Sequence, residues 1–242
     1  MGITINYGMG SYEEMSRQAA DIVAGAVKAK NDAALGLPTG SSPIGMYARL
    51  IEMNKAGDVD FSRVATFNLD EYYPIKKDSP QSYYKFMFDN FFNGINIGPG
   101  NINIPNGEAA DPGRECLEYE QKINKAGGID LMVLGIGANG HIGFNEPGEY
   151  LVPHTHVAEL TAATIEANAR FFCSAGEVPV KALTMGMGSI IAKSKKILML
   201  VSGESKRGVF KKFCDGGRIS ADNPASFLYL HNDVTVLSDL DI

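Results

Sequence analysis

The segment 134–148 is rich in glycine and carries side chains that can move protons. It contains His141 and Glu146, together with Asn139, and it directly follows the apolar segment 130–134. An imidazole is the side chain best suited to exchange protons near neutral pH, and a carboxylate can hold it in one orientation. These residue types between glycines are unusual for a turn with a purely structural role. We therefore interpret the segment as an acid–base loop.

Two adjacent carboxylates, Asp70 and Glu71, follow the predicted strand 64–69. Successive side chains of an extended chain point in opposite directions, so one carboxylate can face a crevice while the other makes structural contacts. A carboxylate shielded from water has a raised pKa and can act as a general base. Taken alone, the pair fits a helix cap or an acidic surface pair as well as it fits a general base.

The segment 35–43 has the composition of an anion site. An apolar strand runs into a turn that contains Thr39, Gly40 and Ser41, and a predicted helix follows. Such a turn presents backbone N–H groups and hydroxyls at the positive end of a helix, which suits a phosphate. An ordinary serine-capped helix start is the alternative, and it is favoured when the segment is considered alone. The spacing matches no nucleotide-binding fingerprint.

Arg170 and Lys206 are the cations that would complete a phosphate site. Arg170 stands beside two phenylalanines, and Lys206 follows another predicted strand. Arginine grips phosphate through two hydrogen bonds and lysine supplies a point charge, although single cations are usually solvated surface groups. His154 and His156 could share one face of a strand. A third metal ligand at suitable spacing is missing, so we predict no metal site.

Strand-like and helix-like segments alternate along the chain. The predicted helices span residues 11–30, 43–54, 82–92, 114–125, 181–192 and 204–213. The predicted strands span residues 33–37, 64–69, 130–135, 196–201, 227–230 and 234–237. This alternation predicts an α/β fold with a mostly parallel, Rossmann-like sheet and helices on both faces. We expect residues 1–242 to form a single domain, with 149–166 as a small mobile lid.

The composition excludes several kinds of partner. The chain has 242 residues and a formal net charge of −6, without a stripe of lysine or arginine, which excludes general nucleic-acid binding. No apolar run approaches the roughly 18–20 residues needed to cross a membrane. Three cysteines without Cys-x-x-Cys spacing, and no visible leader segment, predict a soluble, reduced, cytoplasmic protein.

Four motifs, in this order along the chain, resemble the glucosamine-6-phosphate deaminase (isomerase) family. They are Leu-Gly-Leu-Pro-Thr-Gly from residue 35, Phe-Asn-Leu-Asp-Glu-Tyr from 67, Gly-His-Ile-Gly-Phe-Asn-Glu-Pro from 140 and Ala-Asn-Ala-Arg-Phe-Phe from 167. The resemblance implies that α-D-glucosamine 6-phosphate and water become β-D-fructose 6-phosphate and ammonia, through ring opening, aldose–ketose isomerisation and deamination. It implies neither a cofactor nor a metal.

The resemblance also implies residue roles. Asp70 would move a proton between C2 and C1 of the open-chain sugar, and His141 would open the pyranose ring with support from Asn139 and Glu146. The residues implied to hold the 6-phosphate are Thr39, Gly40, Ser41, Arg170 and Lys206. Some members carry aspartate at the position of Asn139. A neutral amide orients an imidazole but stabilises its cation less.

Hexameric, allosteric members of the family carry basic residues where this chain has His154, His156 and Ala158. The chain therefore resembles the short, non-allosteric type, which implies a monomer, with a low-order homo-oligomer as the alternative. Two other functions stay open. A 6-phosphogluconolactonase shares the fold and a Gly-His pair, and a non-catalytic sugar-phosphate sensor would need neither Asp70 nor His141. The motifs from residues 67 and 140 favour the deaminase.

Overall fold

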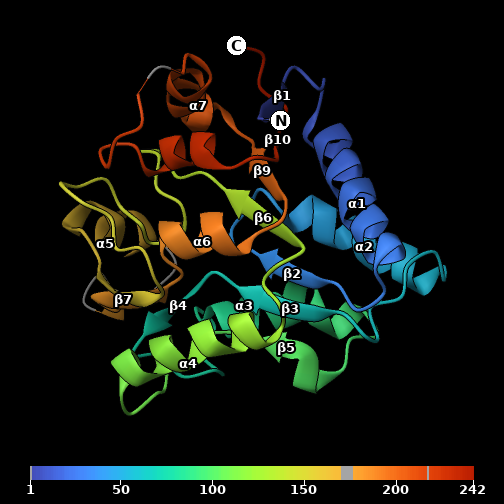
Figure 1. Cartoon of the computed structure of the whole chain (residues 1–242), viewed down its shortest axis with the longest axis horizontal. Helices are drawn as coiled ribbons and strands as arrows, with labels where there is room; N and C mark the ends of the chain where they lie inside the picture. The colour runs from blue at the N-terminus through green and yellow to red at the C-terminus, as the bar shows by residue number, and fades with distance from the viewer. Residues whose placement is uncertain (1, 170–176, 217) are drawn as a thin grey trace.

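A parallel sheet forms the centre of the molecule (Figure 1). The computed structural model describes residues 2–169, 177–216 and 218–242, and within these the sheet has seven strands in the order β1-β10-β9-β6-β2-β3-β5. They are β1 (Ile3–Asn6), β2 (Ala34–Leu37), β3 (Ala65–Asn68), β5 (Ile102–Asn103), β6 (Leu131–Gly135), β9 (Ile197–Val201) and β10 (Val234–Ser238). Every neighbouring pair is parallel, which confirms the predicted sheet type.

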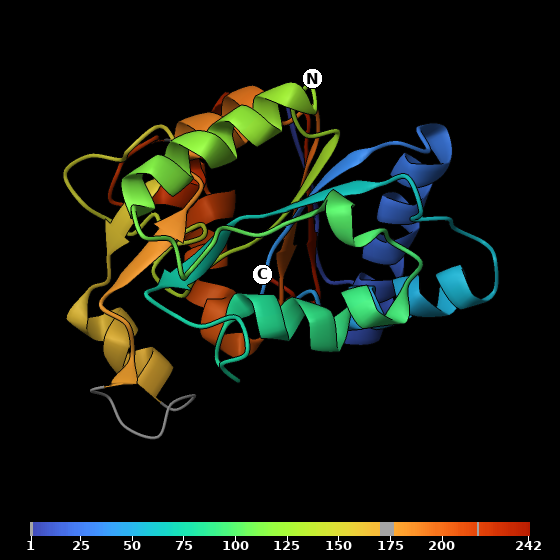
Figure 2. The same ribbon diagram turned by 90° about the horizontal axis from the view of Figure 1, so that it is seen from below.

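Helices cover both faces of this sheet, as the view in Figure 2 shows. They are α1 (Tyr12–Ala29), α2 (Ile44–Lys55), α3 (Tyr83–Asn90), α4 (Pro112–Lys125), α5 (Ala162–Ala169), α6 (Met187–Lys193) and α7 (Arg207–Cys214). One apolar core joins the sheet to α1, α2 and α3, and a second joins the opposite face to α4, α6 and α7. Val133 and Leu134 of β6 enter opposite cores, because successive strand side chains alternate.

Polar side chains set where several helices begin. Ser11 Oγ accepts a hydrogen bond from the Glu14 N–H at 3.1 Å, so Ser11 is the N-cap of α1 as predicted. Ser82 and Asp111 cap α3 and α4 in the same way. Each cap satisfies an N–H group that the first helical turn leaves free. Among the described residues, no helix is both long enough and apolar enough to cross a membrane.

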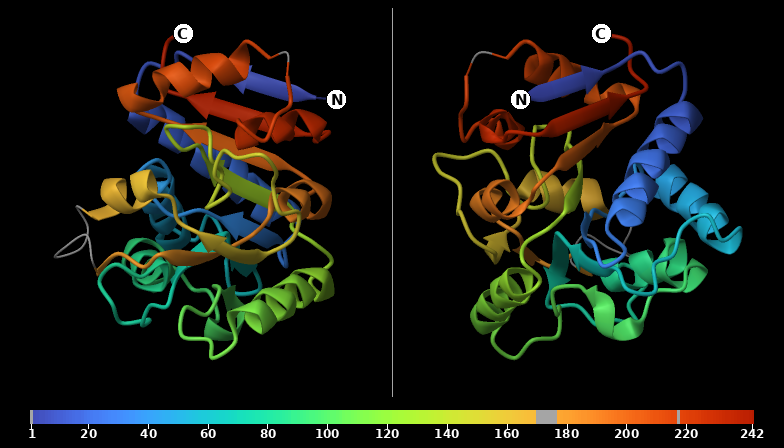
Figure 3. Two further views of the ribbon diagram at one scale, coloured as in Figure 1. Left: turned by 90° about the vertical axis from the view of Figure 1, so that its left-hand side faces the viewer. Right: turned by 45° about the vertical axis from the view of Figure 1, so that its right-hand side comes forward.

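A second sheet, of three antiparallel strands, lies beside the main sheet (Figure 3). In spatial order its strands are β4 (Asp70–Tyr73), β8 (Lys181–Thr184) and β7 (His156–Glu159). Only Leu69 separates the end of β3 from the start of β4, so the chain passes there from the large sheet into the small one. The segment 149–166, predicted as a lid, contains β7 and the start of α5.

Two predicted elements are wrong. The helix predicted at 181–192 is β8 followed by α6, because residues 181–184 pair with both β4 and β7. The strand predicted at 227–230 is part of the 3₁₀ helix Pro224–Leu230. The neighbouring β10 already pairs with β1 and β9, and Leu228 packs into the second core instead. Short apolar runs do not distinguish a buried strand from a helix.

The order of the strands changes direction between β2 and β6. From β2 the chain builds β3 and β5 toward one edge of the sheet, and β6, β9 and β10 then extend it toward the other. Loops that leave the carboxyl ends of β2 and β6 therefore run in opposite directions, and sheets of this kind bind ligands at such a point. The four loops predicted to carry chemistry follow β2, β3, β6 and β9, which are neighbours.

Candidate active site

The relay loop (residues 136–148), which follows β6, holds His141 in a chain of hydrogen bonds. His141 Nδ1 lies 2.7 Å from Asn139 Oδ1, and Asn139 Nδ2 donates to Glu146 Oε2 at 2.7 Å. Asn139 Oδ1 also accepts from the backbone N–H of His141 at 3.2 Å. Glu146 Oε2 itself lies 3.7 Å from His141 Nδ1. The structure thus brings together His141 and the two residues predicted to support it.

These contacts determine which imidazole nitrogen is free. An ionised carboxylate only accepts hydrogen bonds, so Asn139 turns its NH₂ group toward Glu146 and its oxygen toward His141. That oxygen requires a hydrogen on Nδ1, and the neutral ring therefore presents an unprotonated Nε2. Burial lowers the pKa of His141, against the opposing charge of Glu146 and with a further contribution from Lys206. The histidine is consequently neutral near pH 7.

Gly137 lets the imidazole approach the backbone of its own loop. A Cβ at Gly137 would lie between 2.1 and 2.3 Å from three atoms of the His141 ring. Any side chain at this position would displace the ring. The glycine is therefore a steric requirement of the relay, beyond its freedom in a turn.

Asp70 and Glu71, at the start of β4, differ in how their carboxylates are hydrogen-bonded. Glu71 Oε1 accepts from the N–H groups of Tyr72 and Tyr83 at 2.9 and 2.8 Å, and its Oε2 accepts from Tyr84 at 2.8 Å. The Asp70 side chain makes no hydrogen bond to any described residue, although Asp70 is only 6% exposed. Burial, with a contribution from the Glu71 charge, raises the pKa of Asp70 to about 8. Glu71 makes the structural contacts, and Asp70 remains the carboxyl that is predicted to act as the base.

The Asp70 carboxyl lies against the relay loop. A Cβ at Gly143 would lie 3.2 Å from Asp70 Oδ2 and 2.9 Å from Thr184 Oγ1. Thr184 is also the register partner of Asp70 across β4 and β8. Gly143 comes two residues after His141, so their Cα atoms are at most about 7.6 Å apart. Asp70 and His141 therefore lie close to each other at this edge of the sheet.

The loop after β2 presents unused N–H groups. Those of Thr39, Gly40 and Ser41 donate to no described residue. The Tyr12 hydroxyl donates to the Ser41 carbonyl at 3.0 Å, and the Tyr47 hydroxyl donates to the carbonyl of the proline that opens the loop at 2.6 Å. Two tyrosines thus hold the loop by its carbonyl groups while its N–H groups stay available to an anion.

Lys206, which is predicted to bind the phosphate, contacts the relay loop. It ends the 3₁₀ turn Glu204–Lys206 after β9, and its Nζ donates to the Ile136 carbonyl at 2.6 Å. Burial lowers the pKa of Lys206. Arg170, the other predicted cation, lies outside the described residues.

Three further side chains support the relay loop and were missed by the sequence analysis. Thr164 in α5 donates to Glu146 Oε1 at 2.5 Å, and Thr184 Oγ1 accepts from the Phe144 N–H at 3.0 Å. Asn145 Nδ2 donates to two backbone carbonyls, at 2.7 and 2.9 Å. Thr164 and Thr184 lie 18 and 40 residues from their partners, so no local motif marks them.

Comparison with known proteins places this arrangement in a family. The model of the glucosamine-6-phosphate isomerases/6-phosphogluconolactonase family matches residues 11–237. This chain belongs to that family. A member from Thermoanaerobacter sp. (strain X514), named glucosamine-6-phosphate deaminase, is 56% identical over 98% of this chain and 91% of its own. One of the same name from Clostridium botulinum (strain Loch Maree / Type A3) is 53% identical over 95% and 93% of the two chains.

Two solved structures show the same fold at two levels of sequence identity. A monomeric glucosamine-6-phosphate deaminase is 47% identical, with a TM-score of 0.92 over 98% of this chain and 97% of its own. The 6-phosphogluconolactonase of Thermotoga maritima is 20% identical, with a TM-score of 0.74 over 98% of both chains. The lactonase shares the architecture of this chain, whereas the deaminase shares much of the sequence too.

Proposed function

We propose that this chain is a glucosamine-6-phosphate deaminase, which converts α-D-glucosamine 6-phosphate and water into β-D-fructose 6-phosphate and ammonia in amino-sugar catabolism. One observation carries the proposal: Asp70, a buried carboxylate without a hydrogen bond to any described residue, lies against the loop that holds His141. An aldose–ketose isomerisation needs such a base next to a group that opens the sugar ring. Relatives 53–56% identical to the chain carry the deaminase name.

His141 opens the pyranose ring in this mechanism. A closed ring has no carbonyl, so the C1 hydroxyl must lose a proton and the ring oxygen must gain one. The unprotonated Nε2 accepts the first proton and then donates it to the ring oxygen. Asn139 and Glu146 keep the ring in this orientation. Because Asn139 is neutral, the imidazolium is stabilised less than it would be by a carboxylate bonded directly to Nδ1.

Asp70 then carries the isomerisation. It removes the proton from C2 of the open-chain aldehyde, which gives an enol-amine, and returns the proton to C1. The product is an imine at C2, and water hydrolyses it to the ketone of fructose 6-phosphate and ammonia. With a pKa raised to about 8, Asp70 is a stronger base than an ordinary aspartate. A positioned acid–base group of this kind contributes about 10²–10⁴ in rate.

The 6-phosphate orients the sugar from a distance. We assign its binding to the N–H groups of Thr39, Gly40 and Ser41 together with Lys206 and Arg170. Binding a group remote from the reacting carbons places C1 and C2 next to the base. The protein acts as a soluble, cytoplasmic monomer of one domain, and the relative described as monomeric supports that state.

A coupled assay separates this function from its two rivals. Purified protein is expected to release ammonia from glucosamine 6-phosphate and to leave 6-phosphogluconolactone intact. Lactone hydrolysis without ammonia release would assign a lactonase. Saturable binding of glucosamine 6-phosphate without turnover of either compound would assign a sensor.

A further inference from the structure

Lys206 brings a positive charge to the start of the relay loop. Its Nζ donates to the Ile136 carbonyl at 2.6 Å, and Gly137 is the next residue. A Cβ at Gly137 would lie between 2.1 and 2.3 Å from three atoms of the His141 ring. The path from the ammonium through these atoms to the imidazole is therefore no longer than about 10 Å. Charges at this separation interact, and screening by salt is weaker where they are partly buried.

No carboxylate among the described residues neutralises Lys206. It takes part in none of their ion pairs, and its side chain is half-buried. An ammonium has three N–H donors, and the Ile136 carbonyl is the only described acceptor of Lys206. This lysine can therefore bind an anion without first breaking an ion pair.

Three charged side chains face His141 from different elements. Glu146 of the relay loop lies 3.7 Å from Nδ1, Lys206 approaches from the turn after β9, and Asp70 of β4 lies against Gly143. Burial lowers the pKa of His141, the Glu146 charge opposes this change, and the Lys206 charge adds to it. The lysine therefore makes the imidazole a weaker base than the loop alone would make it.

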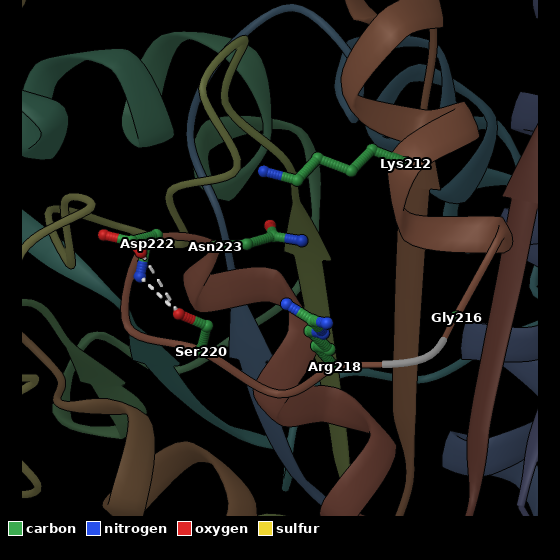
Figure 4. A pocket seen from close by; sticks show the side chains of 6 residues that line it. All are labelled: Lys212, Gly216, Arg218, Ser220, Asp222 and Asn223. Atoms are coloured by element: carbon green, nitrogen blue, oxygen red, sulfur yellow. Dashed lines mark hydrogen bonds between the residues drawn. The ribbon is translucent and has the colours of Figure 1, made fainter.

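The charges on the side of α7 are exposed. Lys212, Arg218 and Asp222 surround Asn223 in Figure 4, and all three are exposed to solvent. Asn223 packs on the relay loop, since a Cβ at Gly140 would lie 2.5 Å from its Oδ1. Solvent and salt screen exposed charges, so this side influences His141 less than the half-buried Lys206 does.

We propose that the anion that binds Lys206 activates His141, because it offsets the lysine charge and makes the imidazole a stronger base. This inference rests on the proposed function, in which the anion is the 6-phosphate of the sugar. The phosphate then does more than orient the substrate. Its binding strengthens the group that takes the proton from the C1 hydroxyl, so a remote contact lowers the barrier at the reacting atoms.

Titration of His141 in the ligand-free protein tests the coupling to Lys206. NMR follows the ring signals of the four histidines against pH, and the signal missing from His141→Gln identifies His141. Lys206→Gln keeps an N–H donor and removes the charge. The acid dissociation constant of His141 should therefore fall about two- to tenfold, the effect of one charge about 10 Å away. Lys206→Arg keeps the charge and should restore the wild-type constant.

Lys211→Gln is the matched control. It removes an exposed lysine of α7 that forms no ion pair with a described residue, and the constant of His141 should stay at its wild-type value. The same constant in Lys206→Gln as in the wild type would overturn the coupling. A shift of equal size in Lys206→Arg would attribute the change to a disturbed loop and would also overturn it.

Inorganic sulfate tests the role of the anion, because it keeps two negative charges throughout the titration. At a concentration that saturates binding in calorimetry, and at matched ionic strength, sulfate should lower the acid dissociation constant of wild-type His141 by a similar factor. An unchanged constant with sulfate bound, or no binding of sulfate, would overturn the role of the anion. Neither titration uses the sugar, so both results are independent of whether the protein releases ammonia.

Discussion

Asp70 and the relay loop, the two regions proposed to transfer protons, have opposite hydrogen-bonding environments. Asp70 is buried without a hydrogen bond to any described residue, and burial, with a contribution from the Glu71 charge, raises its pKa to about 8. His141 is instead tied through Asn139 to Glu146, which Thr164 also contacts. The comparison shows that burial without hydrogen-bond partners makes a carboxylate a stronger base. Hydrogen-bond partners instead fix the orientation of an imidazole and decide which of its nitrogens carries the proton. Substitutions in the two regions should therefore impair turnover in different ways.

The largest expected effect comes from Asp70→Asn, which removes the proposed base and breaks no hydrogen bond to a described residue. Turnover of glucosamine 6-phosphate should fall by about 10²–10⁴ or more, while substrate binding persists. Steady-state kinetics and equilibrium binding check this. Unchanged turnover would remove Asp70 from the mechanism.

The same substitution should stabilise the protein. A carboxyl whose pKa is raised in the folded state binds its proton more tightly there than in the unfolded chain. The folded state therefore loses stability as the pH rises from about 4, the ordinary pKa of aspartate, to about 8. Asp70→Asn should raise the free energy of unfolding by about 1–2 kcal/mol at pH 8. The gain should shrink as the pH falls toward 4, and an equal gain at both pH values would contradict the raised pKa.

His141→Gln should come next, and its effect should depend on the form of the substrate. Ring opening needs the imidazole, so turnover of the closed sugar should fall by about 10²-fold or more. An open-chain substrate analogue bypasses that step and should lose much less. Equal losses with the two compounds, measured side by side, would give the histidine a different role.

Glu71→Gln tests the structural member of the carboxylate pair. An amide offers one acceptor oxygen where the carboxylate used two, so the free energy of unfolding should fall by about 1–3 kcal/mol. Because the Glu71 charge raises the pKa of Asp70, its removal should also shift the pH dependence of catalysis. In the wild type, kcat/KM should rise with pH up to about 8 as Asp70 ionises, and in the variant the rise should come at lower pH. A profile that does not move would exclude coupling between the two carboxyls.

The smallest effect is expected at Thr164, whose hydroxyl reaches Glu146 from α5. Thr164→Val keeps the shape and removes the donor, and kcat should fall by only about 2–10-fold, since one hydrogen bond is worth about 0.5–1.5 kcal/mol. Thr164→Ser retains the hydroxyl and serves as the control, with near-normal kcat. A loss of the same size in both variants would attribute the effect to packing.

The loops of the candidate site were predictable because each follows a short apolar strand of the parallel sheet. β2, β3, β6 and β9 were all predicted from apolar runs, and the residues that follow them include the proposed base, imidazole and lysine. The N-cap of α1 was predicted from Ser11 and Glu14 for the same local reason. Local composition is enough to predict a strand when that strand is buried on both faces.

The small sheet was not predictable by the same reasoning. β4, β8 and β7 are short and mixed in polarity, and they form because strands distant in sequence pair, as residues 70 and 184 do. The contact of Asp70 with Gly143 and that of Thr164 with Glu146 depend on this pairing. A single sequence contains the residue types of the site but not the long-range contacts that decide which of two adjacent carboxylates stays unbonded.

A structure with an open-chain analogue of glucosamine 6-phosphate bound tests most directly whether the two regions act on one sugar. The account predicts that the Asp70 carboxyl lies within about 3–3.5 Å of the C1–C2 unit and that His141 Nε2 faces the oxygen on C5 of the same molecule. An analogue that touches one of these side chains while the other lies beyond its reach would contradict the account.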